Sequence, residues 1–282
     1  MAEQKRAFVT GWPINHSRSP IIHNYWLEKY GLAGSYEKFP CEPENLAGFL
    51  TQLAAHGFVG GNVTVPHKEE AYQLAEQIEP VAQAIGAVNT MWLADGKLHA
   101  TNTDAYGFLA NLDERAPGWD SPEKLQRGAL VLGAGGASRA IIHALVERGF
   151  TSIKIANRTV SKAEILAEQF GPTCHGVALE GENLAATDPA IIINTTAIGM
   201  NDGRSPIELA EFSTDTLVHD IVYTPLITPM LEQAQARGMP VVDGLGMLLH
   251  QAVPGFELWF GVRPEVDDQV RQLVLADMGV SQ

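Results

Sequence analysis

The sequence contains only two cysteines and far more acidic than basic residues. Cys41 and Cys174 are too few for a disulfide framework, and neither lies in a CxxC or Cys/His pattern, so we predict two reduced structural thiols. The formal net charge of -14 opposes binding to a nucleic-acid backbone or to an anionic membrane surface, and no basic run offsets it. We therefore expect no nucleic-acid partner and no membrane partner. A site for an anionic ligand has to be built locally, from Lys, Arg and the amino ends of helices.

Long apolar runs and metal-binding patterns are also missing. No stretch reaches the roughly 18 consecutive apolar residues of a membrane-spanning helix. Residues 1–6 are polar and no apolar run follows them, which is unlike a signal peptide, so we predict a cytoplasmic protein. The nine histidines show no HExxH spacing and have no cysteine partner, and we expect no metal site.

The length of 282 residues and the 45% share of hydrophobic residues favour two domains, each with its own core. In the first hundred residues strand and helix signals alternate, as in βαβ units. A helix is predicted after Pro20 and another opening at Pro66. Asp95-Gly96 is typical of a hairpin turn, so we expect an antiparallel pair of strands at the edge of the sheet. The other predicted elements are strands at 7–9, 36–39 and 58–65, the hairpin strands 88–93 and 98–101, and a helix across 46–53.

A second series of strands and helices follows a polar segment at 113–128, whose Pro and Gly residues predict a surface excursion beside a domain boundary. Short apolar runs separated by helical segments are typical of a parallel sheet covered by helices on both faces. The chain from 245 to 278 is helical in pattern. The predicted strands of this series are 129–132, 153–156, 191–194, 217–221 and 241–242.

A glycine-rich turn joins the first strand of this series to the helix that follows. Glycines let a backbone approach a pyrophosphate, and the amino end of the helix supplies amide donors and a positive dipole end. The turn by itself is equally compatible with a plain tight turn, and Ser138 stands where Gly or Ala is commonest. The residues that would hold the pyrophosphate are Gly133, Ala134, Gly135, Gly136 and Ala137.

Asn157-Arg158-Thr159 follows the next predicted strand, where enzymes that use NAD usually carry an Asp or Glu for the ribose hydroxyls. A carboxylate there would repel a 2′-phosphate, whereas an arginine can bind it with its planar fork of donors. We therefore predict NADP as the cofactor. The alternative is that Arg158 is a solvated charge and that Thr159 or Ser161 only caps a helix.

Two further motifs lie in the first domain. Residues 11–24 contain Ser17 and Ser19 just before Pro20, and residues 61–68 combine Thr64 with Lys68 in the first turn of a helix. Taken alone, Ser19 is a helix N-cap, Ser17 is a loop residue, and the lysine is an exposed charge. A cation at the amino end of a helix is electrostatically misplaced, which a functional role would explain.

In this order and at this separation, the two motifs resemble the shikimate dehydrogenase family, whose members reduce 3-dehydroshikimate to shikimate with a nicotinamide cofactor. The resemblance continues through 86–90, 102–107, 194–200, 220–225 and 243–252, with Ala105 and Ala197 departing from the commoner residues. It implies a two-domain α/β fold with the active site in the cleft between the domains. The implied parts are a substrate domain with a mainly parallel mixed sheet at 1–106, completed by C-terminal helices at 245–282, and a Rossmann-like NADP-binding domain at 107–244.

The resemblance also implies roles for single residues. Ser17 and Ser19 would bind the substrate carboxylate, and Lys68 and Asp104 would share the proton step, without separate roles for the two. Read without the family, Asn89 is a turn residue and Asp104 a helix cap. The other residues implied for the substrate are Thr64, Asn89, Tyr223 and Gln251, and for the cofactor Asn157, Arg158, Thr159, Lys162, Gly244 and Met247.

Two other functions stay open at this point. A quinate/shikimate dehydrogenase of broader specificity would have the same fold, and a non-catalytic regulator that binds NADP or shikimate would have the same sites. Intact Lys68 and Asp104 argue against the regulator. We expect a monomer or homodimer that reversibly reduces 3-dehydroshikimate with NADPH, in the supply of precursors for aromatic amino acids.

Overall fold

The computed structural model describes residues 4–180, 184–200 and 202–280. The chain forms two compact units, of which unit 1 comprises Met1–Gly107 with Leu248–Gln282 and unit 2 comprises Phe108–Met247. The chain passes from unit 1 to unit 2 within α5 (Asp104–Arg115) and returns within α10 (Leu245–Phe260). The predicted two-domain α/β fold is thereby confirmed. Among the described residues, no helix combines the length and the apolar character that crossing a bilayer requires.

Unit 1 is built on a mixed sheet with the strand order β2-β1-β3-β5-β6-β4. β1 (Lys5–Gly11) pairs in parallel with both β2 (Gly34–Pro40) and β3 (Phe58–Val63). β5 (Thr90–Ala94) and β6 (Lys97–Thr101) form the predicted hairpin, in which Asp95 and Gly96 have φ values of 52° and 72°. The helices are α1 (Ser19–Lys29), α2 (Leu46–Thr51), α3 (Lys68–Leu74), α4 (Pro80–Ile85), most of α10, α11 (Asp268–Asp277) and the short 3-10 turn η1 (Pro43–Asn45).

The hairpin does not form the edge of this sheet. β4 (Gln77–Ile78) lies outside it, in parallel with β6, where the backbone amides of Glu76 and Glu79 donate to Leu98 O and Ala100 O. A strand of two residues is too short to show alternation in sequence. The prediction of an edge hairpin was wrong for this reason.

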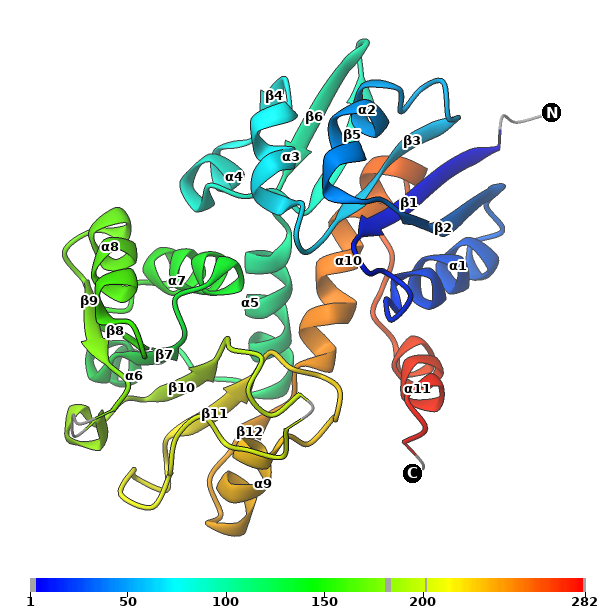
Figure 1. Ribbon diagram of the computed structural model, residues 1–282. Helices are drawn as coiled ribbons and strands as arrows, with labels where there is room; N and C mark the ends of the chain where they lie inside the picture. Colours follow the sequence, from blue (N-terminus) through cyan, green and yellow to red (C-terminus); the bar gives the residue numbers. More distant parts are fainter. Residues whose placement is uncertain (1–3, 181–183, 201, 281–282) are drawn as a thin grey trace. The chain divides into compact units, whose positions relative to one another are not determined.

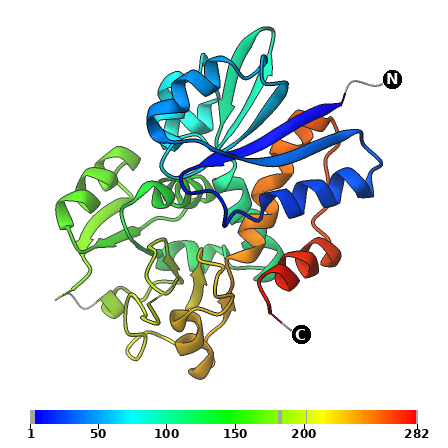
Figure 2. The ribbon, with the colours of Figure 1, turned by 45° about the vertical axis from the view of Figure 1, so that its right-hand side comes forward.

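The two faces of the unit 1 sheet are covered by helices from different parts of the chain (Figures 1 and 2). On one face Phe8 packs edge-on against Phe49 of α2 and Phe58 of β3, beside buried residues of α3 and α4. On the other face α1 and the C-terminal helices pack together, and Trp26 Nε1 donates to Glu265 O while Trp259 Nε1 donates to Met91 O. Burial of these large aromatic side chains joins residues 248–280 to the first hundred residues.

His23 of α1 is enclosed on this second face. It is fully buried, its ring stacks on Tyr36 with centroids 4.0 Å apart, and both of its nitrogens lack a hydrogen-bond partner in the described structure. Burial lowers the pKa of His23 to about 3 from an ordinary 6.5. In unit 2, burial likewise lowers the pKa of His219 to about 4, although Nδ1 lies 2.9 Å from Val242 O. Both rings are therefore neutral in the folded protein at neutral pH.

We expect the free energy of unfolding to fall as the pH drops below 6.5. The unfolded chain then binds protons that the folded protein excludes until the pH approaches 3 for His23 or 4 for His219. The slope approaches about 1.4 kcal/mol per pH unit for each such histidine. Replacement His23→Phe keeps an aromatic ring and removes one titrating group, so the fall should be shallower in urea unfolding curves from about pH 7 to about pH 5.

The control for this experiment is the exposed His175, whose replacement His175→Gln should leave the slope of the wild-type protein unchanged. An equal slope in His23→Phe and in wild type would show that His23 binds protons in the folded state.

Unit 2 contains a second six-stranded sheet, with the order β12-β11-β10-β7-β8-β9 and parallel pairing throughout its described residues. The predicted parallel sheet is therefore confirmed. Alternate residues of the central strands pack against α9 and against the side that carries α7 and α8. The strands are β7 (Ala129–Leu132), β8 (Ile153–Asn157), β9 (Cys174–Ala178), β10 (Ile191–Asn194), β11 (Leu217–Asp220) and β12 (Val241–Val242). The helices are α6 (Pro122–Arg127), α7 (Gly136–Arg148), α8 (Val160–Phe170), α9 (Pro229–Ala236) and the 3-10 turn η2 (Leu184–Thr187).

Two elements of unit 2 differ from the sequence prediction. The edge strand β9 was missed, because its side chains are mostly half-exposed and Gly176 interrupts the apolar pattern to let α8 approach. The segment 113–128, predicted to be an excursion, contains α6 and the buried Trp119, whose Nε1 donates to Asp113 Oδ1 at 2.9 Å. Its Pro and Gly residues are typical of a loop, so the short helix that begins at Pro122 was not predicted.

Candidate active site

Lys68 and Asp104 meet in unit 1 at the amino ends of two helices. Lys68 is the first residue of α3, two residues later than the predicted opening at Pro66, and Asp104 is the first residue of α5. Lys68 Nζ donates to Asp104 Oδ2 at 2.5 Å, and the two side chains are 22% and 14% exposed. The Asp104 carboxylate thus compensates the positive charge of Lys68, which is unfavourable at the amino end of α3. The ammonium group remains within reach of solvent or a ligand.

Asn89 connects this pair to the C-terminal helix α10. Its Nδ2 donates to Asp104 Oδ1 at 2.8 Å and lies 3.5 Å from Gln251 Oε1, while its Oδ1 accepts from the backbone amide of Thr103 at 2.9 Å. Both carboxylate oxygens of Asp104 are therefore bound by side chains. The interpretations of Asn89 as a turn residue and Asp104 as a helix cap do not describe these contacts.

Ser17 and Ser19 lie together at the start of α1. Ser17 Oγ is 3.4 Å from both Ser19 Oγ and the Ser19 amide. The N-cap is Arg18, which makes no side-chain capping bond, so Ser19 is the first helical residue and Pro20 the second. The alternative that Ser19 is the N-cap was wrong, because Arg18 already has near-helical dihedral angles. The two hydroxyl groups thus stand at a helix amino end, where an anion is favoured.

Tyr36 and Asn62 link the serines to Asn89, a role that the sequence analysis missed. The buried Tyr36 hydroxyl interacts with Ser19 and donates to Asn62 Oδ1 at 2.6 Å. Asn62 Nδ2 donates in turn to Asn89 O at 3.0 Å. Burial raises the pKa of Tyr36 well above its usual range, so the hydroxyl stays a neutral donor. The signal for this network was a polar Asn62 within an otherwise buried, apolar strand.

Thr64 follows β3 and is half-buried. Its amide donates to Thr10 O at 2.9 Å, and its methyl group fills the space beside Gly11, where an added Cβ would come within 2.6 Å of Thr64 Cγ2. The glycine of the first motif thus permits the close approach of the threonine of the second.

A cavity of about 480 Å³ opens in unit 2 at the carboxyl ends of β7, β8 and β10. Ligands of parallel α/β sheets bind at these ends. Five of the predicted cofactor residues line the cavity, together with residues 195–198 and Leu179, Asp202 and Arg204. These five are Gly133, Ala134, Gly135, Asn157 and Arg158.

The glycine turn has the conformation that its residues predict. Gly133 has a φ of 109°, and an added Cβ would lie 2.9 Å from both Thr195 Oγ1 and Thr196 Cγ2. The turn leads into α7, which begins at Gly136. Ser138 is buried and its hydroxyl donates to Gly135 O at 2.6 Å, so the serine supports the turn in place of the usual small residue. A pyrophosphate can therefore come close to the backbone amides of this turn.

The remaining predicted cofactor residues lie outside the described lining of this cavity. Thr159 is the N-cap of α8 without a side-chain capping bond, and Lys162 is exposed in the first turn of that helix. Gly244 stands close to the backbone oxygens of Asp220 and Ile221. Six predicted cofactor residues do not line the cavity: Gly136, Ala137, Thr159, Lys162, Gly244 and Met247. The predicted substrate residue Tyr223 also belongs to unit 2, where it is half-buried after β11.

A buried polar network supports the loops around the cavity. Asn194 Nδ2 donates to Asp220 Oδ1 at 3.0 Å, and Asn194 Oδ1 accepts from the amide of Thr196 at 3.0 Å. Thr228 donates to Asp220 Oδ2 at 2.7 Å. Burial raises the pKa of Asp220, while hydrogen bonds from Thr228 and Asn194 oppose the shift. The network holds the loop after β10 against the loop after β11.

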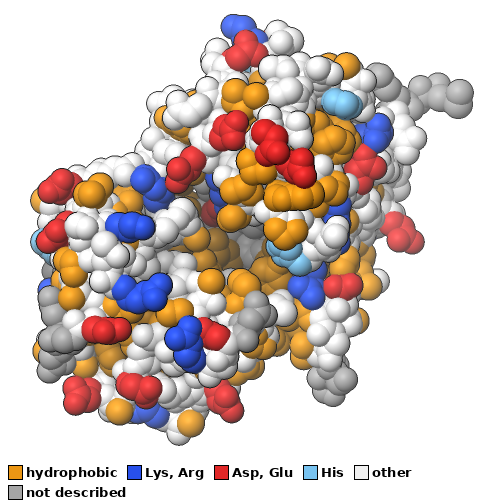
Figure 3. Space-filling model, in the orientation of Figure 1, with side chains coloured by type: hydrophobic (Ala, Val, Ile, Leu, Met, Phe, Trp, Pro, Cys, Tyr) orange, Lys and Arg blue, Asp and Glu red, His pale blue; other side chains and the backbone are white. Residues whose placement is uncertain are grey.

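The cavity carries positively charged side chains, although the chain as a whole has a formal net charge of -14. Arg158 and Arg204 both line it. Figure 3 shows Lys and Arg side chains at several places on the displayed face of unit 2. The groups of three or more His, Cys, Asp or Glu side chains that could hold a metal ion are absent from the described residues.

Three family models match successive parts of the chain. They are the shikimate dehydrogenase substrate binding domain over residues 9–91, the shikimate/quinate 5-dehydrogenase over 121–235, and the shikimate 5′-dehydrogenase C-terminal domain over 244–275. Curated relatives are similar over almost their full length. A shikimate dehydrogenase (NADP(+)) of Brucella abortus strain S19 is 52% identical over 282 residues, which are 99% of this chain and 96% of the relative. Another with the same name, from Rhizobium etli strain CIAT 652, is 53% identical over 276 residues, or 97% and 95% of the two chains.

A solved structure agrees with these matches. Shikimate 5-dehydrogenase from Thermus thermophilus, in complex with NADP(H) and shikimate, is 39% identical and superposes with a TM-score of 0.85. The superposition covers 96% of this chain and all of the other.

Proposed function

This chain belongs to the shikimate dehydrogenase family, and on that premise we propose that it catalyses the reversible, NADPH-dependent reduction of 3-dehydroshikimate to shikimate. The observation that carries the proposal is the Lys68, Asp104 and Asn89 constellation in the unit that matches the substrate binding domain. The predicted family, the dehydrogenase activity and the NADP cofactor are confirmed by relatives of that name over nearly the whole chain. The roles of single residues are our proposal.

Substrate binding in this proposal uses the polar groups that unit 1 brings together. Ser17 and Ser19 at the amino end of α1 hold the substrate carboxylate, where the helix dipole and two hydroxyl donors favour negative charge. Asn89 and Gln251, 3.5 Å apart, bind ring hydroxyls together with Thr64. Fixing both ends of a small ring in this way sets the orientation of its reacting carbon. Tyr223 of unit 2 is a further substrate contact in this proposal, carried by the resemblance.

The proton step is assigned to Lys68 and Asp104 as a pair. A hydride that adds to a ketone carbon leaves negative charge on the oxygen, and a positioned donor has to supply a proton there. The Lys68 ammonium is such a donor, and Asp104 holds it in place at 2.5 Å while Asn89 holds Asp104. In the oxidation of shikimate the same pair removes the hydroxyl proton. The proposal therefore gives the proton step to the pair and assigns no separate role to either group.

The cavity of unit 2 fits NADP in the chemistry of its lining. Gly133 and Gly135 permit a close backbone approach, α7 presents its amino end, and Arg158 offers a planar cation for the 2′-phosphate. When bound, the cofactor supplies or accepts the hydride. Asn157 and Thr159 contact the same end in this proposal, with Lys162 as a weaker basic contact. As the resemblance implies, the backbone of Gly136 and Ala137 would complete the pyrophosphate site, and Gly244 and Met247 would bind the nicotinamide end.

Finer features of the function are part of the same proposal. The enzyme works in the cytoplasm, as a monomer or homodimer, in the supply of aromatic amino acid precursors. A purified-protein assay that follows the ultraviolet absorbance of NADPH, with shikimate or quinate against NADP or NAD, tests the activity. Turnover fastest with shikimate and NADP supports the proposal. Faster turnover of quinate supports the broader dehydrogenase, and cofactor binding without turnover of either acid supports the regulator.

Replacing Ser17 or Ser19 with Ala is expected to raise KM for shikimate by about 10- to 150-fold. Each hydroxyl donates to a charged carboxylate, and loss of such a bond costs about 1.5–3 kcal/mol. Steady-state kinetics of the two single variants measure this change. Ser121→Ala in unit 2, a serine without a side-chain capping bond, is the matched control and should keep the wild-type KM. An unchanged KM in both variants, with only a lower melting temperature, would limit the two serines to supporting the helix.

A further inference from the structure

Arg204 and Asp202 form a compact ion pair in the loop after β10. Asp202 Oδ2 accepts from Arg204 Nε at 2.9 Å and from Arg204 Nη2 at 2.7 Å. Asp202 Oδ1 accepts from the amides of Gly199 at 2.9 Å and Arg204 at 3.2 Å. The loop backbone therefore fixes the carboxylate, and the carboxylate fixes one edge of the guanidinium group. Among the described residues, Nη1 of Arg204 has no hydrogen-bond partner, and its side chain is 70% exposed.

Both oxygens of the Asp202 carboxylate are already hydrogen-bonded within the loop. The amide of Gly199, followed by the Arg204 side chain, lowers the pKa of Asp202 to about 2. Asp202 is therefore charged at neutral pH, and its charge is compensated by Arg204. An acidic residue at a dinucleotide cavity often binds ribose hydroxyls, but here both carboxylate oxygens already accept two donors each.

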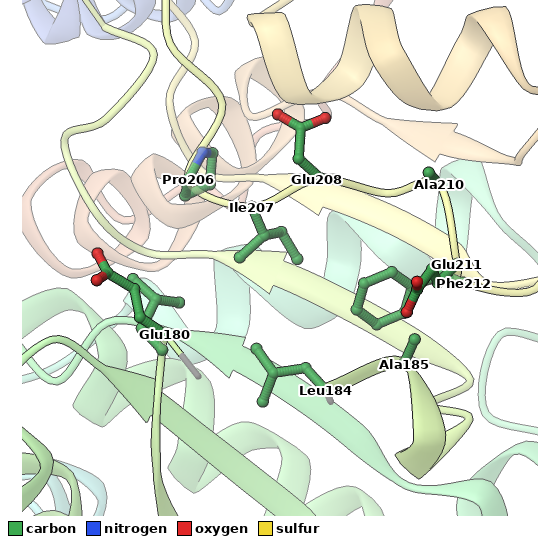
Figure 4. A pocket seen from close by; sticks show the side chains of 10 residues that line it. Glu180, Leu184, Ala185, Pro206, Ile207, Glu208, Ala210, Glu211 and Phe212 are labelled. Carbon is green, nitrogen blue, oxygen red and sulfur yellow. The ribbon is translucent and has the colours of Figure 1, made fainter. Parts of the chain in front are cut away.

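The course of the chain after Arg204 leads toward β9. Pro206 and Ile207 line a second cavity of about 600 Å³ together with Glu180, which follows β9 (Figure 4). The neighbouring Leu179 also lines this cavity. Ile207 and Leu179 also pack against one buried cluster of unit 2, which includes Leu132 and residues of α9. Residues 206 and 207 therefore lie close to the chain that follows β9, and the strand order β10-β7-β8-β9 places β7 and β8 between β9 and the strand that precedes the loop.

Arg204 and Arg158 both line the cofactor cavity, and Leu179 connects the loop that carries Arg204 to the end of β8. Leu179 lines both cavities, and its amide donates to Asn157 O at 3.2 Å, next to Arg158. The glycine turn, by contrast, follows β7, and α7 already presents amide donors for a pyrophosphate there. The part of a dinucleotide that reaches beyond β8 is the adenosine ribose with its 2′ substituent.

We propose that Arg204 is a further ligand of the 2′-phosphate of NADP, acting with Arg158, and that Asp202 is the positioning residue that orients its guanidinium group. This inference rests on the proposed NADP-binding cavity and adds a specificity-determining residue to it. Two guanidinium groups suit a dianionic phosphate, since each can donate two parallel hydrogen bonds. In a variant without the Arg204 side chain, the uncompensated Asp202 carboxylate would repel the phosphate, which adds to the expected loss of NADP affinity.

Isothermal titration of wild type and Arg204→Ala with NADP and with NAD, in the absence of shikimate, tests the inference. We expect the NADP dissociation constant to rise at least about fivefold, and at most about fiftyfold because the side chain is exposed. The constant for NAD should stay within about twofold. Titration with 2′,5′-ADP, which has the 2′-phosphate and lacks the pyrophosphate bridge, should show the same loss as NADP. The loss should shrink at high ionic strength.

Arg115→Ala is the matched control, because Arg115 is an exposed arginine of unit 2 outside the cavity lining and its loss changes the net charge equally. This variant should keep the wild-type constants for both cofactors. A rise of less than about fivefold for NADP in Arg204→Ala, or an equal rise for NADP and NAD, would overturn the role of Arg204. The proposed NADP site itself fails only if wild type does not prefer NADP, so the two results are distinguishable in one set of titrations.

Discussion

The variant Lys68→Ala is expected to lose about a hundredfold or more in kcat, since general acid-base groups typically supply roughly 10²–10⁴ in rate. Lys68 Nζ is the ammonium group held by Asp104, in a pair that is only partly exposed to solvent. Its removal leaves the developing alkoxide without a positioned proton donor. Affinity for NADP should change little, because the cofactor cavity is lined by residues of unit 2.

Stopped-flow or steady-state measurement of NADPH consumption gives kcat, and titration gives the cofactor constant. Lys97→Ala is the matched control, because Lys97 is an exposed lysine on the β5–β6 hairpin, and it should behave as wild type. Asp104→Asn should also lower kcat, since the amide no longer holds the ammonium as a charged partner. A Lys68→Ala enzyme with a kcat close to that of wild type would remove Lys68 from the mechanism.

The variant Arg158→Ala is expected to raise the NADP dissociation constant by about 10- to 150-fold and to leave the weaker NAD constant little changed. Arg158 lines the cofactor cavity beside Asn157, at the end of β8 where an NAD enzyme would carry an acidic residue. Loss of a charge-assisted bond to the 2′-phosphate costs about 1.5–3 kcal/mol. Isothermal titration with both cofactors measures the two constants directly.

Two outcomes would contradict this assignment. Equal losses for NADP and NAD would mean that Arg158 supports the fold of its loop, and tighter binding of NAD by wild type would reverse the predicted preference. Arg158→Lys is an informative companion variant, because it keeps the charge and removes the planar fork, so an intermediate loss of NADP affinity is expected.

Features that depend on neighbouring residues in the chain were predicted correctly. Asp95 and Gly96 both have positive φ in the hairpin turn, a conformation that these two residue types accept. Gly133 likewise has a positive φ at the turn between β7 and α7, where any side chain would meet the loop at Thr195 and Thr196. In such cases the local chemistry of one or two residues selects the backbone conformation.

Features that depend on distant partners were missed or shifted. β4 forms a strand only because its two residues pair with β6, and β9 is a strand because β8 offers an edge to it. α3 begins at Lys68 instead of Pro66, and α1 begins with Arg18 as the cap in place of Ser19. Neither the edge of a sheet nor the last residue outside a helix leaves a distinct pattern in a sequence.

The sequence by itself determined which chemical groups this protein has for its reaction. The serine pair, the lysine after β3, the glycine turn and the arginine in place of an acidic residue are visible as motifs, because each depends on residue type and short spacing. Only the tertiary structure decided which of these groups bind one another. Lys68 meets Asp104 across 36 residues, and Asn89 comes within 3.5 Å of Gln251 across 162. Such pairs form when strand register and helix packing bring distant segments together, and short-range patterns carry no record of that register.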